Sequence, residues 1–196
     1  MNLANKLTLI RMILVPVFLV FLVFDCIPYG KLIATALFIV ASITDKLDGY
    51  IARSRNQVTN FGKFMDPLAD KLLVTAAFVS LVELNSIPAW AVVVILAREF
   101  AVSGLRTIAA SEGKVIAASW WGKIKTVIQI IAIILLLLNV SIGEYAFLSD
   151  FISGIGILNW IFSSLSIYMF YIAVAITIVS GIDYFIKNKE TISTTK

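Results

Sequence analysis

The chain has 196 residues, of which 60% are hydrophobic, and a formal net charge of +4. Its mean hydropathy of +0.98 exceeds that of a soluble domain, which is usually about half apolar, and the modest charge gives no indication of nucleic-acid binding. The chain contains no histidine and one cysteine, which excludes histidine catalysis, histidine metal ligation and an intrachain disulfide. Asp and Glu therefore remain as the main acid–base and metal-binding residues.

Six apolar segments follow one another along the chain, and an apolar run of about 20 residues can cross a bilayer as a helix. They span approximately residues 7–24, 32–43, 68–84, 89–108, 120–140 and 157–186. The second run is short, so we expect its helix to continue through Asp45 and Asp48. The sixth is too long for one straight span, so we expect its first turns at the membrane interface. These segments predict an all-α, polytopic membrane protein with six transmembrane helices, formed by one integral-membrane catalytic domain over residues 1–196.

The basic residues orient this arrangement in the membrane. We interpret the first apolar run as a span rather than a cleavable signal peptide, because no small-residue cleavage site follows it. With the N-terminus inside, only Lys31 of the 16 Lys and Arg residues falls outside, as the positive-inside rule favours. The external loops instead carry Asp25, Glu83, Glu144 and Asp150. Both chain ends and the segment 45–70 are thus predicted on the cytoplasmic side of the plasma membrane.

Four aspartates make the segment 45–70 the most informative part of the sequence. Asp45 and Asp48 are three residues apart, so on a helix they share one face. Asp66 and Asp70 are four apart and do the same, and Pro67 suits a first helical turn, so we expect Asp66 to cap the third helix. Negative charges near lipid require neutralisation. Mg²⁺ and Mn²⁺ prefer oxygen ligands, and such ions also bind phosphate oxygens, so the pattern indicates a metal site for a phosphate substrate. The alternative is that the acids are solvated loop residues paired with nearby Lys and Arg side chains.

The spacing of these residues resembles the complete signature of the CDP-alcohol phosphotransferase family. The pattern reads Asp45-x2-Asp48-Gly49-x2-Ala52-Arg53-x8-Gly62-x3-Asp66-x3-Asp70. The resemblance implies the fold of that family, with six transmembrane helices, a divalent metal, and usually a homodimer. It also implies transfer of a substituted phosphate from a CDP-linked donor to an alcohol, with release of CMP. By position, the resemblance implies that the metal ligands are Asp45, Asp48 and Asp66. It implies that Asp70 is the base that deprotonates the acceptor and that it also contacts a second ion. The residues against the CDP part would be Gly49, Ala52, Arg53 and Gly62.

The N-terminal sequence indicates which donor and acceptor are used. Asn5, Thr8, Arg11 and Pro16 are spaced as in family members that join CDP-diacylglycerol to sn-glycerol 3-phosphate. The resemblance implies that Asn5, Thr8 and Arg11 help to bind CDP and that the product is an anionic phospholipid precursor. Helix capping and an interfacial charge also explain these three residues. Cardiolipin-type relatives share much of this opening, so cardiolipin-type and inositol-phosphate-type synthases remain alternatives.

Basic side chains in the fourth and fifth apolar segments suggest a phosphorylated acceptor. A charged side chain at that depth needs a partner or a path to water, and the phosphate of a small acceptor is a suitable partner. The alternative explanation is positive-inside topology, in which the aliphatic parts of these side chains lie along the apolar layer and their charged groups reach the interface. Glu99 is a candidate counter-ion for either arginine. The candidate acceptor-phosphate residues are Arg98, Arg106, Lys123 and Lys125.

Two functions outside this family also fit parts of the sequence. Acidic clusters within membranes serve ion pathways, so an ion-coupled transporter is one alternative. Such transporters often contain inverted repeats and broken helices, which the sequence does not display. A structural membrane adaptor is the other alternative, and it leaves the four clustered carboxylates unexplained.

Overall fold

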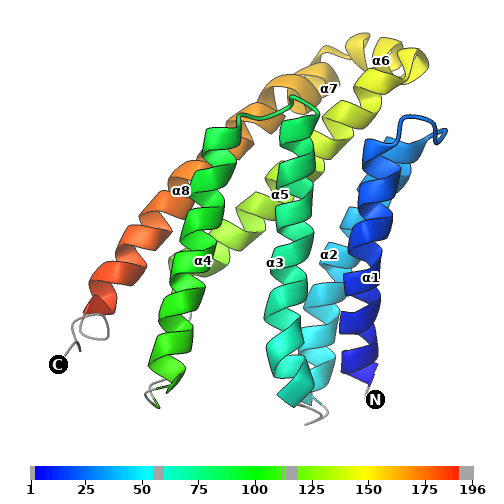
Figure 1. Ribbon diagram of the computed structural model, residues 1–196. Helices are drawn as coiled ribbons and strands as arrows, with labels where there is room; N and C mark the ends of the chain where they lie inside the picture. The colour runs from blue at the N-terminus through cyan, green and yellow to red at the C-terminus, as the bar shows by residue number, and fades with distance from the viewer. Residues whose placement is uncertain (1–2, 55–59, 112, 114–118, 190–196) are drawn as a thin grey trace.

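The computed structural model describes residues 3–54, 60–111, 113 and 119–189, and these residues form helices and short connections. Six long helices run up and down between two ends of the molecule, and the first helix starts and the last long helix ends at the lower end in Figure 1. Three short helical pieces at the upper end connect the fifth long helix to the sixth. The long helices are α1 (Leu3–Val23), α2 (Gly30–Ser54), α3 (Asn60–Glu83), α4 (Ala89–Ser111), α5 (Trp120–Glu144) and α8 (Ser166–Lys187); the short pieces are α6 (Ala146–Ser153), α7 (Gly156–Trp160) and the π-helical turn η1 (Ile161–Leu165).

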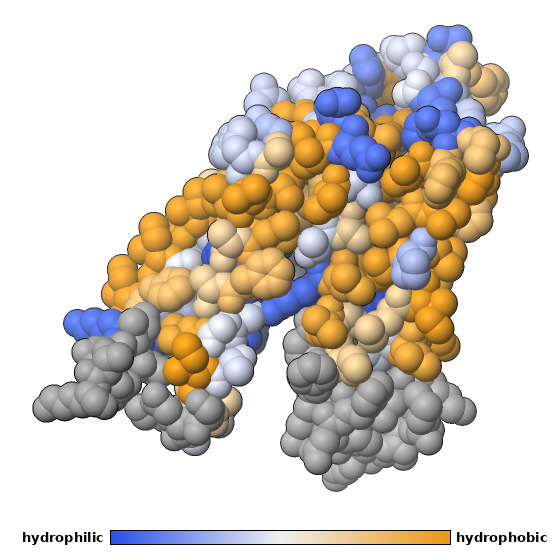
Figure 2. Space-filling model, viewed as in Figure 1, coloured by the Kyte–Doolittle hydropathy of each residue, from blue (hydrophilic) through white to orange (hydrophobic). Residues whose placement is uncertain are grey.

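The all-helical prediction is confirmed for the residues described, and each long helix overlaps one of the six apolar segments, the sixth of which also covers most of α7 and all of η1. Within those residues, two helical segments are long and apolar enough to cross a membrane, namely Trp120–Glu144 and Gly156–Lys187. Shorter apolar stretches occupy Thr8–Val23 and Gly30–Thr44. Figure 2 shows hydrophobic residues covering most of the visible surface of the long helices. In α4 the charged residues Arg98 and Glu99 interrupt the apolar run.

The predicted start of the third helix is wrong. The helix α3 begins at Asn60, six residues before Asp66, so Asp66 lies in the second turn and does not cap the helix. By contrast, α2 continues to Ser54, and its backbone carries Asp45 and Asp48 beyond the apolar run, as predicted. The polar end of α2 and the polar start of α3 therefore continue as helix beyond the apolar parts of these two helices.

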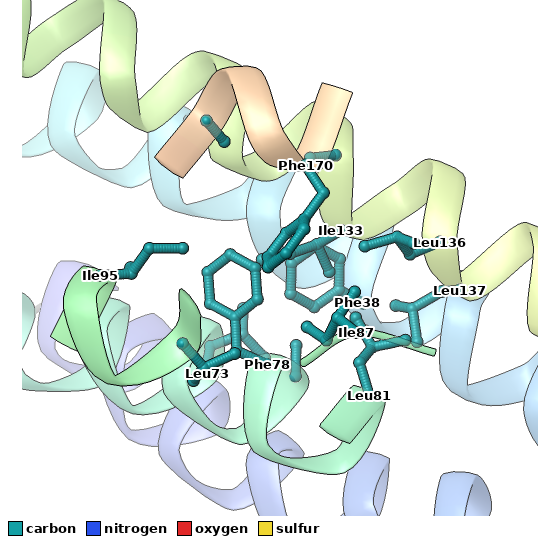
Figure 3. Packing of buried hydrophobic residues seen from close by; sticks show 14 of the residues in the cluster. Phe38, Leu73, Phe78, Leu81, Ile87, Ile95, Ile133, Leu136, Leu137 and Phe170 are labelled. Atoms are coloured by element: carbon teal, nitrogen blue, oxygen red, sulfur yellow. The ribbon is translucent and has the colours of Figure 1, made fainter. Parts of the chain in front are cut away.

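Aromatic side chains fill the space where the long helices meet. The rings of Phe78 on α3 and Phe170 on α8 lie 6.1 Å apart, centroid to centroid, and both residues are fully buried. Figure 3 shows Phe38 of α2 and Ile133 of α5 reaching the same cluster. A second pair of rings, Phe18 and Phe38, joins α1 to α2 with centroids 6.0 Å apart. This shared core fixes the relative positions of the helices.

Ion pairs hold the upper end of the bundle together. The Lys31 Nζ lies 3.0 Å from Asp25 and 3.5 Å from Glu144, which begins the connection to α6. Nearby, the rings of Tyr29 and Tyr145 stack with centroids 5.1 Å apart. The basic residue that departs from the positive-inside pattern is therefore neutralised by two acids of the same end.

We expect Phe170→Ala to lower the free energy of unfolding by about 3 kcal/mol, because it leaves a cavity against Phe78 in the fully buried core. Denaturant titration in mixed detergent micelles would measure this loss. The matched control is Phe100→Ala on α4, where the ring is 62% exposed and the expected change is within about 0.5 kcal/mol. Equal losses in the two variants would contradict this account of the core.

Candidate active site

The aspartate signature is carried by the lower ends of two helices. Asp45 and Asp48 lie in the last turns of α2, and Asp66 and Asp70 lie in the first turns of α3. The two helix ends lie at the same end of the bundle, next to the start of α1 (Figure 1), and α1 packs against both helices. The side chains of all four aspartates lie outside the part of the chain that the structure describes, so their convergence on a metal stays a prediction.

The proposed CDP-contacting residues belong to the same three helix ends. Gly49, Ala52 and Arg53 lie in the last two turns of α2, and Gly62 lies in the first turn of α3. Their side-chain environments, and that of Asn5 in α1, are outside the described region. Thr8 and Arg11 are described, and both are almost completely buried. The roles of Thr8 and Arg11 in binding CDP stay a prediction, and so does the alternative of helix capping and an interfacial charge.

A carboxylate shared by two cations connects α4 to α5. Lys125 of α5 donates a hydrogen bond to the Glu99 Oε1, and the Arg98 Nη1 lies 3.6 Å from the same oxygen. The exposed fractions of the Lys125 and Glu99 side chains are 5% and 19%. Among the residues that the structure describes, two cations therefore share one anion. Within the residues described, no cluster of three or more Asp, Glu or Cys side chains is arranged to hold a metal ion.

Further hydrogen bonds connect this group to α3. Lys71 of α3 donates a hydrogen bond to the Ser103 hydroxyl, and Ser103 donates to the carbonyl of Glu99 at 2.8 Å. Lys71 directly follows Asp70, so this contact attaches the middle of α3 to α4 just after the last aspartate of the signature. In Figure 2, a notch opens between the lower parts of α3 and α4, with hydrophilic residues at its apex.

The C-terminal helix α8 completes the polar group from the other side. The Arg98 Nη2 donates a hydrogen bond to the Ser180 hydroxyl at 2.6 Å, and the Arg106 Nε donates one to the Tyr184 hydroxyl at 3.1 Å. The Arg106 guanidinium carbon also lies 5.5 Å from the centroid of the Tyr184 ring, within cation–π range.

The structure joins some of the basic residues predicted to bind acceptor phosphate and separates others. Arg98 and Lys125 meet at Glu99, whereas Arg106 lies against Tyr184. Lys123 is exposed in the first turn of α5, which follows the N-cap residue Ser119. Glu99 was correctly considered a counter-ion for Arg98, but its closer partner is Lys125.

The contribution of α8 was missed at the level of sequence. Thr177, Ser180, Gly181 and Tyr184 are all buried, and their spacing of three, four and seven residues places them on one face of the helix. Thr177 accepts a hydrogen bond of 3.0 Å from Gln129 of α5. This stripe of small and polar residues within an apolar helix was the signal that could have identified α8 as part of the site.

A groove between α4 and α8 opens beside Arg98. Its volume is about 470 Å³. Apart from Arg98, its walls are apolar and include Val94 of α4 and Ile178 and Phe185 of α8. The site therefore combines a charged group with an apolar channel that faces outward between two helices.

Comparison with known proteins identifies the family. The family model for CDP-alcohol phosphatidyltransferase matches residues 1–179. The chain belongs to the CDP-alcohol phosphatidyltransferase family. The assignment made from the aspartate signature is thereby confirmed, and the match extends through α8 as far as Val179.

Members of this family from several bacteria match the chain over most of its length. The CDP-diacylglycerol–glycerol-3-phosphate 3-phosphatidyltransferase of Bacillus subtilis is 46% identical, over 98% of this chain and 98% of the relative. The protein of the same name from Rickettsia bellii is 37% identical, over 94% of this chain and 93% of the relative. A probable phosphatidylglycerophosphate synthase of Mycobacterium tuberculosis is 45% identical, over 71% of this chain and 68% of the relative.

We expect Glu99→Gln to lower the free energy of unfolding by about 3 kcal/mol, because the substitution leaves the buried Lys125 ammonium without its counter-charge. A double-mutant cycle with Lys125→Met in detergent micelles would measure the coupling. The double variant should lose less stability than the sum of the two single losses, by about 1–3 kcal/mol. Strictly additive losses would show that the two side chains do not stabilise each other.

Proposed function

We propose that this protein transfers the phosphatidyl group of CDP-diacylglycerol to sn-glycerol 3-phosphate. The products are phosphatidylglycerol phosphate and CMP, and the reaction serves anionic phospholipid biosynthesis. The observation that carries this proposal is the 46% identity over 98% of both chains to a relative named for this reaction. The complete aspartate signature at the lower ends of α2 and α3 supports it.

The chemistry assigned to the aspartates follows from their type and placement. Carboxylates at two neighbouring helix ends provide the oxygen ligands that hard divalent cations prefer, so Asp45, Asp48 and Asp66 would hold Mg²⁺ or Mn²⁺, and Asp70 would contact a second ion. Such an ion neutralises charge on the diphosphate and stabilises the leaving CMP. The acceptor hydroxyl oxygen attacks the phosphorus that bears the diacylglycerol, its proton passes to Asp70, and the bond from that phosphorus to CMP breaks.

The phosphorylated acceptor would bind at the cationic group beside this centre. Arg98 and Lys125 share the charge of Glu99, so they retain positive charge for a phosphate that a neutral acceptor would lack. Arginine presents a planar set of donors suited to phosphate oxygens. We include Arg106 and the exposed Lys123 as further contacts of this phosphate. The outward-facing groove between α4 and α8 is suited to an acyl chain of the lipid, because its walls are mainly apolar.

We also propose that all six long helices cross the plasma membrane, with both termini and the active site cytoplasmic. The long helices have between 21 and 25 residues, which at 1.5 Å per residue corresponds to a hydrocarbon core of about 30 Å; the polar turns of α2 and α3 that carry the aspartates would lie in the cytoplasmic headgroup region. The Lys31 ion pairs lie at the opposite end of the bundle from the termini. Membership of the family further leads us to expect a homodimer.

We expect purified protein in mixed micelles to release CMP from CDP-diacylglycerol when glycerol 3-phosphate and Mg²⁺ or Mn²⁺ are both present. Chelation by EDTA should stop the release, and either ion should restore it. Phosphatidylglycerol and inositol phosphate, supplied instead of glycerol 3-phosphate, test the cardiolipin-type and inositol-phosphate-type alternatives. No release with any acceptor under a range of divalent ions would favour the transporter or adaptor.

We expect the aspartates to separate into two classes on substitution. Asp70→Asn should lower kcat by at least about a hundredfold, because it removes the proposed base, but CDP-diacylglycerol should still raise the Tm. Asp45→Asn should abolish turnover through loss of the metal, and added Mg²⁺ should then fail to stabilise the protein. Full activity in Asp70→Asn would rule out its role as the base.

A further inference from the structure

The helix α8 contributes no residue to the aspartate signature, yet it contacts both arginines of the proposed acceptor site. Its buried stripe consists of Thr177, Ser180, Gly181 and Tyr184. Burying a hydroxyl in an apolar bundle is unfavourable unless the group is hydrogen-bonded. Here three of the four residues use their hydroxyl groups to bind side chains of α4 or α5.

Ser180 and Gly181 together determine where the Arg98 side chain lies. Ser180 accepts the hydrogen bond from Nη2 at 2.6 Å. A Cβ atom at Gly181 would lie 3.0 Å from the Arg98 Cγ, a separation too short for an undisturbed side chain. The absence of a side chain at Gly181 therefore gives the aliphatic stem of Arg98 room to pass along α8, while the hydroxyl next to it orients the guanidinium.

Tyr184 has the same relation to Arg106 one turn further along α8. Its hydroxyl accepts from the Arg106 Nε, and its ring lies within 5.5 Å of the guanidinium carbon. The ring is itself fixed, because it is buried in a cluster with Val102 and Leu105 of α4. A guanidinium held in this way has lost much of its rotamer freedom before a ligand arrives.

We propose that α8 is the positioning element of the acceptor-phosphate site, in which Ser180 and Gly181 fix Arg98 and Tyr184 fixes Arg106. This inference rests on the proposed function, since it assigns the two arginines to the phosphate of the acceptor. Prepositioning lowers the entropic cost of binding. The α8 residues therefore determine the affinity for a phosphorylated acceptor, whereas the aspartates perform the transfer.

Steady-state kinetics of Ser180→Ala and Tyr184→Phe test this proposal. Each variant should raise the KM for glycerol 3-phosphate by up to about tenfold, because the freed guanidinium must then be ordered when the phosphate binds. The KM for CDP-diacylglycerol and kcat should change less than about twofold, because the diphosphate centre is untouched. As a readout independent of turnover, the rise in Tm caused by glycerol 3-phosphate should shrink in both variants, and glycerol should raise the Tm of neither.

Matched controls distinguish positioning from a general loss of packing. Ser141→Ala removes a hydroxyl that shares a buried hydrogen bond of 3.1 Å with Thr35, between α2 and α5, and should leave the acceptor KM unchanged. Gly181→Ala should raise that KM, whereas Gly143→Ala in α5, where an added Cβ would meet nothing within 4 Å, should not. A rise in acceptor KM in the controls equal to that in the α8 variants would overturn the proposal.

The variant Arg98→Ala separates failure of this inference from failure of the proposed function. If Arg98→Ala raises the acceptor KM while Ser180→Ala and Tyr184→Phe leave it unchanged, the positioning role of α8 is wrong and the acceptor site stands. If Arg98→Ala leaves the acceptor KM unchanged, the assignment of that residue to the phosphate is wrong, and the inference fails with it. Equal increases in the KM of both substrates would likewise contradict a role specific to the acceptor.

Discussion

Charge neutralisation inside an apolar helical bundle is the constraint on which the site depends. An isolated ammonium or guanidinium in such surroundings is strongly unfavourable, so the buried Lys125 needs the carboxylate of Glu99. That carboxylate lies on α4 and Lys125 lies on α5, so the ion pair also fixes one helix against the other. Arg98 contacts the same oxygen, and through Ser180 this contact continues to α8. The shared anion links α4 to α5 directly, and through Arg98 this polar network reaches α8.

Ion pairing has opposite consequences at the upper end of the bundle and around Glu99 in the middle of α4. At the upper end, Lys31 lies between Asp25 and Glu144, so acids outnumber the base and an anionic ligand would be repelled. Around Glu99 the described cations outnumber the acid, which suits the anion that we propose binds there. The ratio of acids to bases therefore distinguishes the two clusters. The Lys31 cluster is suited to a structural role, and the Glu99 cluster is suited to bind phosphate.

The proposed active site combines two parts of the bundle. The aspartates and the N-terminal residues belong to α1, α2 and α3, whereas the proposed acceptor contacts belong to α4, α5 and α8. Lys71 and Ser103 connect the two parts, because their hydrogen bond joins α3 to α4 just beyond Asp70. In the proposed reaction, this connection holds the base at a fixed place relative to the acceptor. A displacement of even 1 Å between such parts can cost a large factor in rate.

The sequence by itself determined the helical segments, the extension of α2 through Asp45 and Asp48, and the family, because apolar runs and fixed residue spacings are local properties of the chain. It misplaced the start of α3, since the polar residues from Asn60 onward carry no strong boundary signal. Only the tertiary structure decided that Glu99 meets Lys125, that Arg106 meets Tyr184, and that the small residues of α8 face α4. These contacts depend on how each helix is rotated about its axis and which helix lies beside it. Both are set by packing across the whole bundle, which no single segment encodes.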